Sequence, residues 1–280
     1  MEESQLSSSG RKPNRDIPTD RFQEWCCGRI RRGGSWLRPV LERSRSERCS
    51  RQGVGACLPP IGSGDGAWLR VIASNNCLLP PLHVVTDDDL LARSDFPLRA
   101  RRVLAAGGRR LALHLRGHAT PGSQLCGLAA DLKAAASAAG AFLFANDRVD
   151  VAMVAGLDGV HLGQRSLPPS VARPLLRQGT WVGVSVHDPK EAQAAGADTD
   201  YLVVGTVFAT ASHPGRMGSG PAGVARVRAV VGLPLFATGG VTAERVSEVV
   251  AAGAQGVAVL RGIWSRDDPA TAVADYLRVL

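Results

Sequence analysis

The stretch AFLFANDRVDVAMVAGLDGVHLG, residues 141–163, reads as one complete strand–helix–strand unit. Apolar runs at 141–147 and 159–163 predict two strands, and residues 148–156 between them predict a short helix. Both strand runs are almost continuously apolar, which is typical of a parallel sheet covered on its two faces. The stretch therefore predicts a protein of the α/β class.

The same alternation extends along the chain on both sides of this unit. We expect the other strands at 82–87, 110–116, 181–187, 201–208, 234–240 and 256–262. We expect the other helices at 89–106, 122–139, 168–178, 188–196, 221–231, 243–252 and 267–279. Eight strands, each followed by a helix, predict a (β/α)₈ TIM barrel. An open doubly wound sheet is the alternative, but the first strand lacks the glycine-rich phosphate turn of that fold.

The chain before the barrel has a different composition. Residues 1–80 hold 13 Lys and Arg against 8 Asp and Glu, so they carry most of the chain's net charge of +8. This polar, glycine-rich segment cannot bury enough apolar surface to fold, and we expect a disordered leader over 1–79 and the barrel over 80–280. Because the excess charge lies in the leader, we expect no nucleic-acid binding. The sequence has neither a bilayer-spanning apolar run nor a secretory signal, which predicts no membrane partner and a cytoplasmic protein.

Polar residues follow the predicted strands, and the carboxyl ends of barrel strands meet at one face. These residues are Thr86, Asp87, Arg116, His118, Asn146, Asp147, His161, Gln164, Ser185, His187, Thr206, Thr210, Ser212, His213, Gly239, Gly240, Arg261 and Gly262. Asp147 can hold a metal or cap the helix after it. His118 and His187 can move protons near neutral pH. We expect His114 and His161 in the core, and His83 at the opposite end of the barrel.

Two glycine-containing segments predict a phosphate site. ATGGV (237–241) and AVLRGI (258–263) follow the last two strands, where glycine lets the backbone approach an anion. Gly239 and Gly240 can also serve only to make a tight turn. The loop FATASHPGRMGSG (208–220) is either a mobile lid over an anionic ligand or an ordinary flexible loop.

Residues 81–278 resemble the thiamine phosphate synthases and the related thiazole tautomerases. The resemblance is carried by HVVTD, ANDRVDVAMVAGLDGVHLGQRSLP, VGVSVHDPKEAQAAGADTDYLVVGTVFATASHPG and LFATGGVTAERVSEVVAAGAQGVAVLRGI. It implies that a pyrimidine methyl diphosphate is joined to a thiazole phosphate with Mg²⁺ as cofactor. It also implies that Asn146 and Asp147 hold the pyrimidine diphosphate and Mg²⁺, and that Ser185 contacts the diphosphate. The residues implied for the thiazole phosphate are Thr210, Ser212, Gly239, Gly240, Leu260 and Arg261.

The sequence departs from the family pattern at several positions. The strand-two motif Gln-x-Arg-Glu-Lys is His114-Leu115-Arg116-Gly117-His118 here, a second metal carboxylate is replaced by Ser166, and a phosphate lysine is replaced by His213. The histidine that tautomerases carry after strand six is Thr206. We therefore expect a synthase with Arg116, His118, Ser185 and His187 as catalytic residues and Asp147 as metal ligand. A metal-free tautomerase and a non-catalytic barrel that binds the thiazole phosphate are the alternatives.

Overall fold

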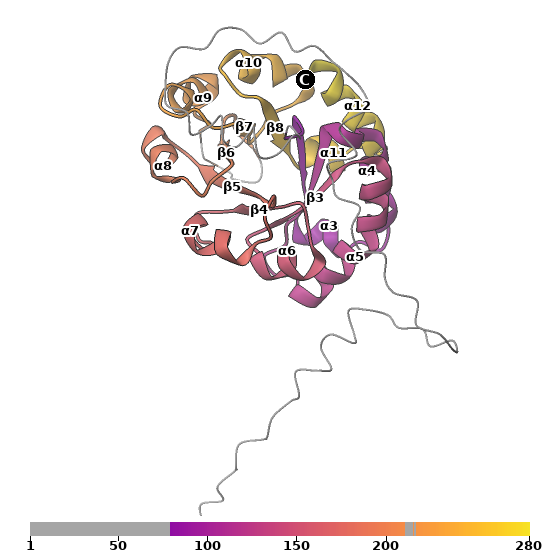
Figure 1. Ribbon diagram of the computed structural model, residues 1–280. Coiled ribbons are helices and arrows are strands. Elements are labelled where there is room, and N and C mark those ends of the chain that lie inside the picture. Colours follow the sequence, from indigo (N-terminus) through magenta and orange to yellow (C-terminus); the bar gives the residue numbers. More distant parts are fainter. Residues whose placement is uncertain (1–78, 211–214, 216) are drawn as a thin grey trace, which may run out of the picture. The chain divides into compact units, whose positions relative to one another are not determined.

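The computed structural model describes residues 79–210, 215 and 217–280, and these form a closed barrel of eight parallel strands (Figure 1). The barrel closes because β8 pairs with β1. The strands are β1 (Leu82–Val85), β2 (Leu111–Leu115), β3 (Phe142–Asn146), β4 (Gly159–Leu162), β5 (Trp181–Val186), β6 (Tyr201–Val204), β7 (Leu235–Thr238) and β8 (Gly256–Val259). Each lies inside its predicted range, so the TIM-barrel prediction is confirmed. The predicted leader lies outside the described residues, except for Leu79, which is buried with residues of the barrel interior.

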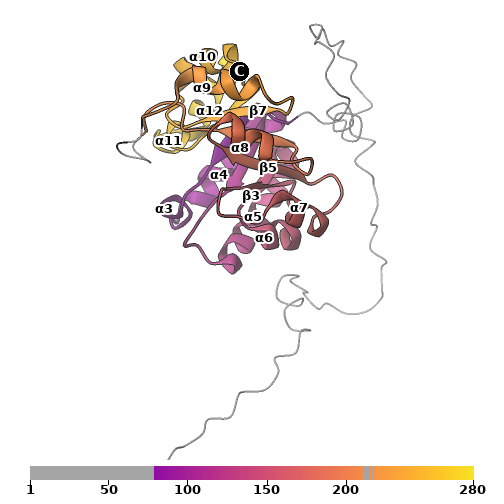
Figure 2. The ribbon, with the colours of Figure 1, turned by 90° about the vertical axis from the view of Figure 1, so that its left-hand side faces the viewer.

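The helices form a ring outside the strands (Figures 1 and 2). The α-helices are α3 (Asp88–Leu91), α4 (Phe96–Gly107), α5 (Gly122–Ala139), α6 (Val149–Ala155), α7 (Pro169–Ala172), α8 (Pro189–Ala194), α9 (Gly220–Arg228), α10 (Val246–Ala251), α11 (Arg261–Trp264) and α12 (Pro269–Val279). Short 3₁₀ turns are η2 (Gly108–Arg110), η3 (Arg173–Leu175) and η4 (Ala243–Arg245). None of these described helices is long and apolar enough to cross a membrane.

Proline and capping residues divide three elements that the sequence predicts as continuous. The predicted helix 89–106 is two helices, because Asp87 caps α3 and Pro97 opens the first turn of α4. The predicted helix 168–178 is interrupted near Pro174, where α7 gives way to η3. The predicted strand 256–262 ends at Val259, and Arg261 instead begins α11.

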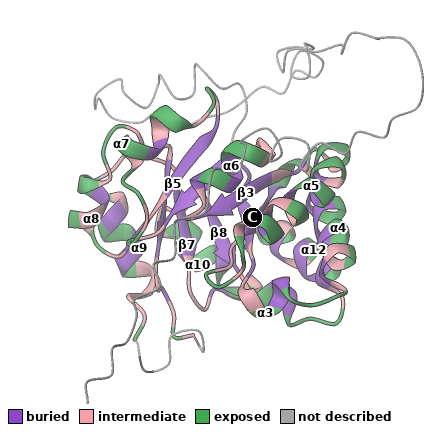
Figure 3. Ribbon diagram, turned by 90° about the horizontal axis from the view of Figure 1, so that it is seen from below, coloured by how far each residue is buried: buried purple, intermediate pink, exposed green. Residues whose placement is uncertain are grey.

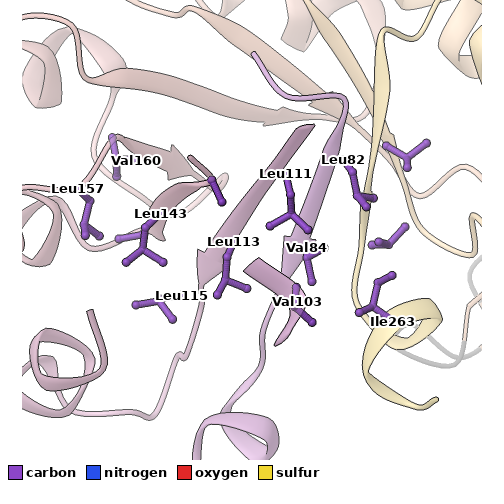
Figure 4. Close-up of a cluster of buried hydrophobic side chains, with 14 of the residues drawn as sticks. Leu82, Val84, Val103, Leu111, Leu113, Leu115, Leu143, Leu157, Val160 and Ile263 are labelled. Atoms are coloured by element: carbon purple, nitrogen blue, oxygen red, sulfur yellow. The ribbon is translucent and has the colours of Figure 1, made fainter. Parts of the chain in front are cut away.

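The core has two compartments separated by the sheet. Alternate strand residues such as Leu111, Leu113 and Leu115 of β2 point outward and pack with buried side chains of the helix layer, such as Val103 (Figure 4). The burial view shows the same division, with buried strands and helices exposed on their outer faces (Figure 3). The residues between them point inward, and the interior holds Ala112, Phe144, Trp181, Tyr201, Val203, Phe236 and Ala258. The few aromatic side chains of the barrel are thus concentrated inside it.

Candidate active site

Asp147 lies directly after β3 and points across the barrel mouth to the neighbouring β4 loop. Its carboxylate Oδ1 accepts a hydrogen bond of 2.8 Å from the backbone N–H of Gly163 and a second from the hydroxyl of Ser166. Its backbone has a φ of +62°, a left-handed conformation that Asp and Asn tolerate better than other side chains. Helix α6 begins after Arg148 and has no side-chain cap. The interpretation of Asp147 as a helix cap is therefore wrong.

The serine at the predicted second carboxylate position is part of this same cluster. Ser166 also accepts a hydrogen bond of 3.1 Å from the N–H of Gly163, so it is held beside Asp147 rather than facing solvent alone. The described residues give Asp147 no hydrogen bond through Oδ2. A single hard carboxylate oxygen fits Mg²⁺, which usually takes one or two carboxylates and completes its shell with water and substrate phosphates.

Arg116 and His118 meet at the end of β2. An Nη2 hydrogen of Arg116 is donated to Nε2 of His118 over 2.6 Å. With Nε2 accepting, a neutral His118 carries its proton on Nδ1. Thr86 joins this end of β2 to β1, because its hydroxyl accepts from the N–H of Arg116 and donates to the carbonyl of the same residue. The two predicted catalytic residues are thus brought together as one cationic corner.

Asp88 holds the loop that carries His118. Its carboxylate accepts hydrogen bonds from the backbone N–H groups of His118, Ala119 and Thr120 and from the Thr120 hydroxyl, at 2.6–3.0 Å. Burial alone would raise the pKa of Asp88, but these hydrogen bonds outweigh it and lower the pKa below its usual value. Asp88 therefore positions the β2 loop only when it is ionised.

Replacing Asp88 by alanine is expected to lower the melting temperature by about 2–4 °C at pH 7, which corresponds to about 1 kcal/mol for a partly exposed acceptor. A lowered pKa gives stability that is present above the unfolded value of about 3.9 and is lost as pH falls through the folded value. The difference between wild type and variant should therefore shrink toward pH 3, as thermal melts can show. Asp89→Ala is the matched control, because Asp89 is the exposed neighbour. An equal difference at both pH values would contradict this role.

Ser185 and His187 lie at the end of β5 but have different surroundings. Ser185 Oγ lies 2.8 Å from Nε2 of the buried His161, whereas His187 Nδ1 is paired at 3.0 Å with Glu191 of its own helix. Burial, the largest effect, lowers the pKa of His161 to about 4, so this ring is neutral at pH 7. His161 Nδ1 is buried without a partner among the described residues.

The proton of His161 can be placed from this geometry. An orphaned buried N–H is rarer than an under-satisfied acceptor, so the proton belongs on Nε2, which donates to Ser185. The Ser185 hydroxyl hydrogen is then free to reach a ligand.

Gly239 and Gly240 form the phosphate-type turn after β7. Their φ values are +91° and +62°, and a Cβ on Gly240 would lie 2.6 Å from the carbonyl oxygen of Ala209. A Cβ on Gly239 would meet Thr206 at 2.5 Å. Both positions therefore require glycine, because of conformation and because the β6 loop packs directly against them. This close packing brings the backbone of two loops together at one corner of the barrel mouth.

The surroundings of that turn come from the last three strands. Thr210 follows β6, Leu260 precedes α11, and Arg261 is exposed at the start of that helix. Ser212 and His213 lie outside the described residues, and so does the question of a lid over 208–220. In the closed barrel order, this half of the mouth faces the half formed by β2 to β5.

Four positioning residues were not predicted from the sequence. Besides Asp88, they are Glu191, Arg245 and Tyr276. The Arg245 guanidinium lies 4.6 Å from the ring centre of Phe208, and the Tyr276 hydroxyl donates to the Val241 carbonyl at 2.9 Å. Only Glu191 had a readable signal, since it is four residues after His187 on a helix.

The fold and this division of polar groups define a TIM-barrel protein that holds anionic ligands at the carboxyl ends of its strands. A model of the family described as thiamine monophosphate synthase matches residues 82–263, and the chain belongs to that family.

Among curated proteins, the chain is 41% identical over 199 residues to the thiamine-phosphate synthase of Methanoculleus marisnigri, which covers 70% of this chain and 93% of the relative. It is 46% identical over 157 residues to the thiamine-phosphate synthase of Mycobacterium bovis, covering 55% and 68%. Among solved structures, the thiamine phosphate pyrophosphorylase of Pyrococcus furiosus superposes with a TM-score of 0.61 at 28% identity, covering 71% of this chain and 94% of that one.

Proposed function

We propose that this protein makes thiamine phosphate by joining a pyrimidine methyl diphosphate to a thiazole phosphate, with release of diphosphate. The observation that carries the proposal is the Asp147 carboxylate, which points across the barrel mouth instead of capping its helix. The names of its relatives support the same reaction. Thr206, at the position of the tautomerase histidine, supports a synthase over an isomerase.

In this reaction the bond between the pyrimidine methylene carbon and the diphosphate oxygen breaks, and its electron pair leaves with the diphosphate. The thiazole nitrogen then donates its lone pair to the cationic methylene carbon and forms the new C–N bond. The rate depends on stabilising the negative charge that grows on the leaving diphosphate. Arg116, the Nδ1–H of His118 and the free hydroxyl hydrogen of Ser185 are suitably placed donors for that charge.

Asp147 would hold Mg²⁺, the ion that the family typically uses, with Ser166 beside it. When bound, Mg²⁺ neutralises charge on the diphosphate oxygens. The opposite half of the mouth would hold the thiazole phosphate through Thr210, Ser212, His213, Gly239, Gly240, Leu260 and Arg261. His187 would lie beside the diphosphate, oriented by Glu191. The cytoplasmic location stays a prediction.

The test is turnover of both substrates by the purified chain, with Mg²⁺ and with a chelator, followed by detection of thiamine phosphate. We expect product only when Mg²⁺ is present. If the thiazole phosphate binds but no product forms, the synthase proposal fails. A carboxythiazole phosphate substrate then distinguishes a tautomerase from a binding protein.

Replacing Ser166 by aspartate is expected to lower the Mg²⁺ concentration for half-maximal rate by about tenfold, because a second hard anionic ligand joins Asp147. The rise in melting temperature on adding Mg²⁺ with inorganic diphosphate should increase in parallel. Ser166→Ala is the matched control, since it removes the same hydrogen bond to Asp147 without adding a carboxylate. Equal Mg²⁺ requirements in the two variants would show that position 166 does not face the metal.

A further inference from the structure

The barrel interior contains a hydrogen-bonded row of side chains that ends at Asn146. His83 Nδ1 lies 2.9 Å from His114 Nε2, and His114 Nδ1 lies 2.8 Å from Oδ1 of Asn146. The rings of His83 and His114 have centroids 4.9 Å apart. His83 was expected at the opposite end of the barrel, but its ring reaches upward to a residue of the neighbouring strand. The row thus runs from the interior to the last residue of β3.

Both rings are neutral. Burial, the largest effect, lowers the pKa of His114 to about 3 and the pKa of His83 well below its usual value. The charged or titratable groups that act on His83 are His114 and His161, and both lower its pKa further. A neutral imidazole has one N–H, so each ring donates through one nitrogen and accepts through the other.

One orphaned atom determines the direction of the row. His83 Nε2 is buried and has no hydrogen-bond partner among the described residues. The Pro80 backbone lies near this ring and raises its pKa slightly against burial, yet no hydrogen bond joins them, so it does not hold a proton on Nε2. Because an orphaned N–H costs more than an orphaned acceptor, the proton of His83 belongs on Nδ1.

The remaining protons follow from that assignment. His83 Nδ1–H donates to His114 Nε2, so His114 carries its own proton on Nδ1 and donates it to the Asn146 oxygen. The Asn146 amide is then oriented with its Nδ2 hydrogens away from His114. The described residues give Nδ2 no hydrogen-bond partner. In the opposite proton arrangement the amide would turn over and present its oxygen instead.

We infer that His83 and His114 form a positioning pair that holds the Asn146 amide with its donor side toward the substrate, so that this corner of the site selects a hydrogen-bond acceptor such as a phosphate oxygen or a pyrimidine ring nitrogen. His114 does not touch the substrate in this arrangement, because both its ring nitrogens are engaged by protein. The inference rests on the proposed function for the identity of the ligand.

The proton assignment can be tested without turnover. Long-range ¹H–¹⁵N correlation spectra of the full chain, with histidine nitrogens labelled, report which ring nitrogen carries the proton. His83→Phe and His114→Phe spectra assign the signals. We expect Nδ1–H on both rings in the wild type. An Nε2–H form of either ring would overturn the inference, whether or not the wild type makes thiamine phosphate.

The functional consequence is tested by His114→Phe, which keeps a ring of similar size and removes both hydrogen bonds. We expect KM for the pyrimidine diphosphate to rise about tenfold and KM for the thiazole phosphate to stay within about twofold. Tyr201→Phe is the matched control, since the Tyr201 hydroxyl is buried in the same interior without a partner among the described residues. Equal KM changes for the two substrates would count against a specific role.

Two further variants separate positioning from packing. His114→Gln keeps a donor toward Asn146 and an acceptor toward His83, so its KM should stay within about threefold of wild type, and it remains informative if His114→Phe does not fold. In an Asn146→Ala background, His114→Phe should add almost nothing, because the two residues act as one unit. A full additional tenfold loss in that background, or a Gln variant as impaired as the Phe variant, would overturn the inference.

Discussion

Replacing Asp147 by asparagine is expected to remove the Mg²⁺-dependent rate, with a loss of about a hundredfold or more. Asparagine has nearly the same shape, tolerates a positive φ, and still accepts hydrogen bonds from Gly163 and Ser166. It has no anionic oxygen for Mg²⁺. The change therefore separates metal binding from folding, and the melting temperature without Mg²⁺ should shift by no more than about 2 °C.

The measurement is the initial rate as a function of Mg²⁺ concentration, together with the rise in melting temperature that Mg²⁺ causes in the presence of inorganic diphosphate. Asp150→Asn is the matched control, because Asp150 is a nearby carboxylate that is ion-paired with Arg148 on the outside of α6. It should keep the wild-type response to Mg²⁺. An Asp147→Asn enzyme with the wild-type Mg²⁺ response would remove Asp147 from the metal site and leave the synthase reaction without its proposed anchor.

Replacing Gly240 by aspartate is expected to abolish binding of the thiazole phosphate, with a loss of affinity of about a hundredfold or more. Three effects act in the same direction. The φ of +62° disfavours any side chain, the new Cβ would lie 2.6 Å from the Ala209 carbonyl oxygen, and a carboxylate would repel a phosphate. The turn and the β6 loop must move apart to admit the side chain.

Titration calorimetry with each substrate separately distinguishes a local from a general effect. Binding of the pyrimidine diphosphate should be retained, because that ligand is assigned to the half of the mouth formed by β2 to β5. Gly196→Asp is the matched control: it has a φ of +76° but nothing within 4 Å of its Cβ. Gly240→Ala, without the charge, should have an intermediate effect. Thiazole phosphate binding close to wild type in Gly240→Asp would show that the phosphate lies elsewhere.

The strand order could be predicted because each strand is a short apolar run, buried on both faces and bounded by polar or glycine residues. Helix boundaries were predicted less well. The rise of α4 after a break at Asp95 and the start of α11 at Arg261 depend on caps and on packing against α12, which periodicity does not show. The same limit applies to His83, whose place in the strand predicts its level in the barrel but not the direction of its ring.

The candidate site divides in a similar way. The sequence determined which residues lie at the carboxyl ends of the strands, because strand order and parallel direction alone place them on one face. It also indicated that Gly239 and Gly240 face an anion, although a simple tight turn remained an alternative. Their φ values and the close approach of the β6 loop show that the turn also packs tightly against its neighbour.

By itself, then, the sequence determined the barrel, its polar end and the family to which the chain belongs. Only the tertiary structure decided the partner of each polar side chain: Ser166 with Asp147, Asp88 with the His118 loop, and His83 with His114 and through it Asn146. The physical reason is that hydrogen bonds depend on the direction and separation of individual atoms. In a closed sheet, the atoms that meet come from neighbouring strands separated along the chain by a whole helix and its loops.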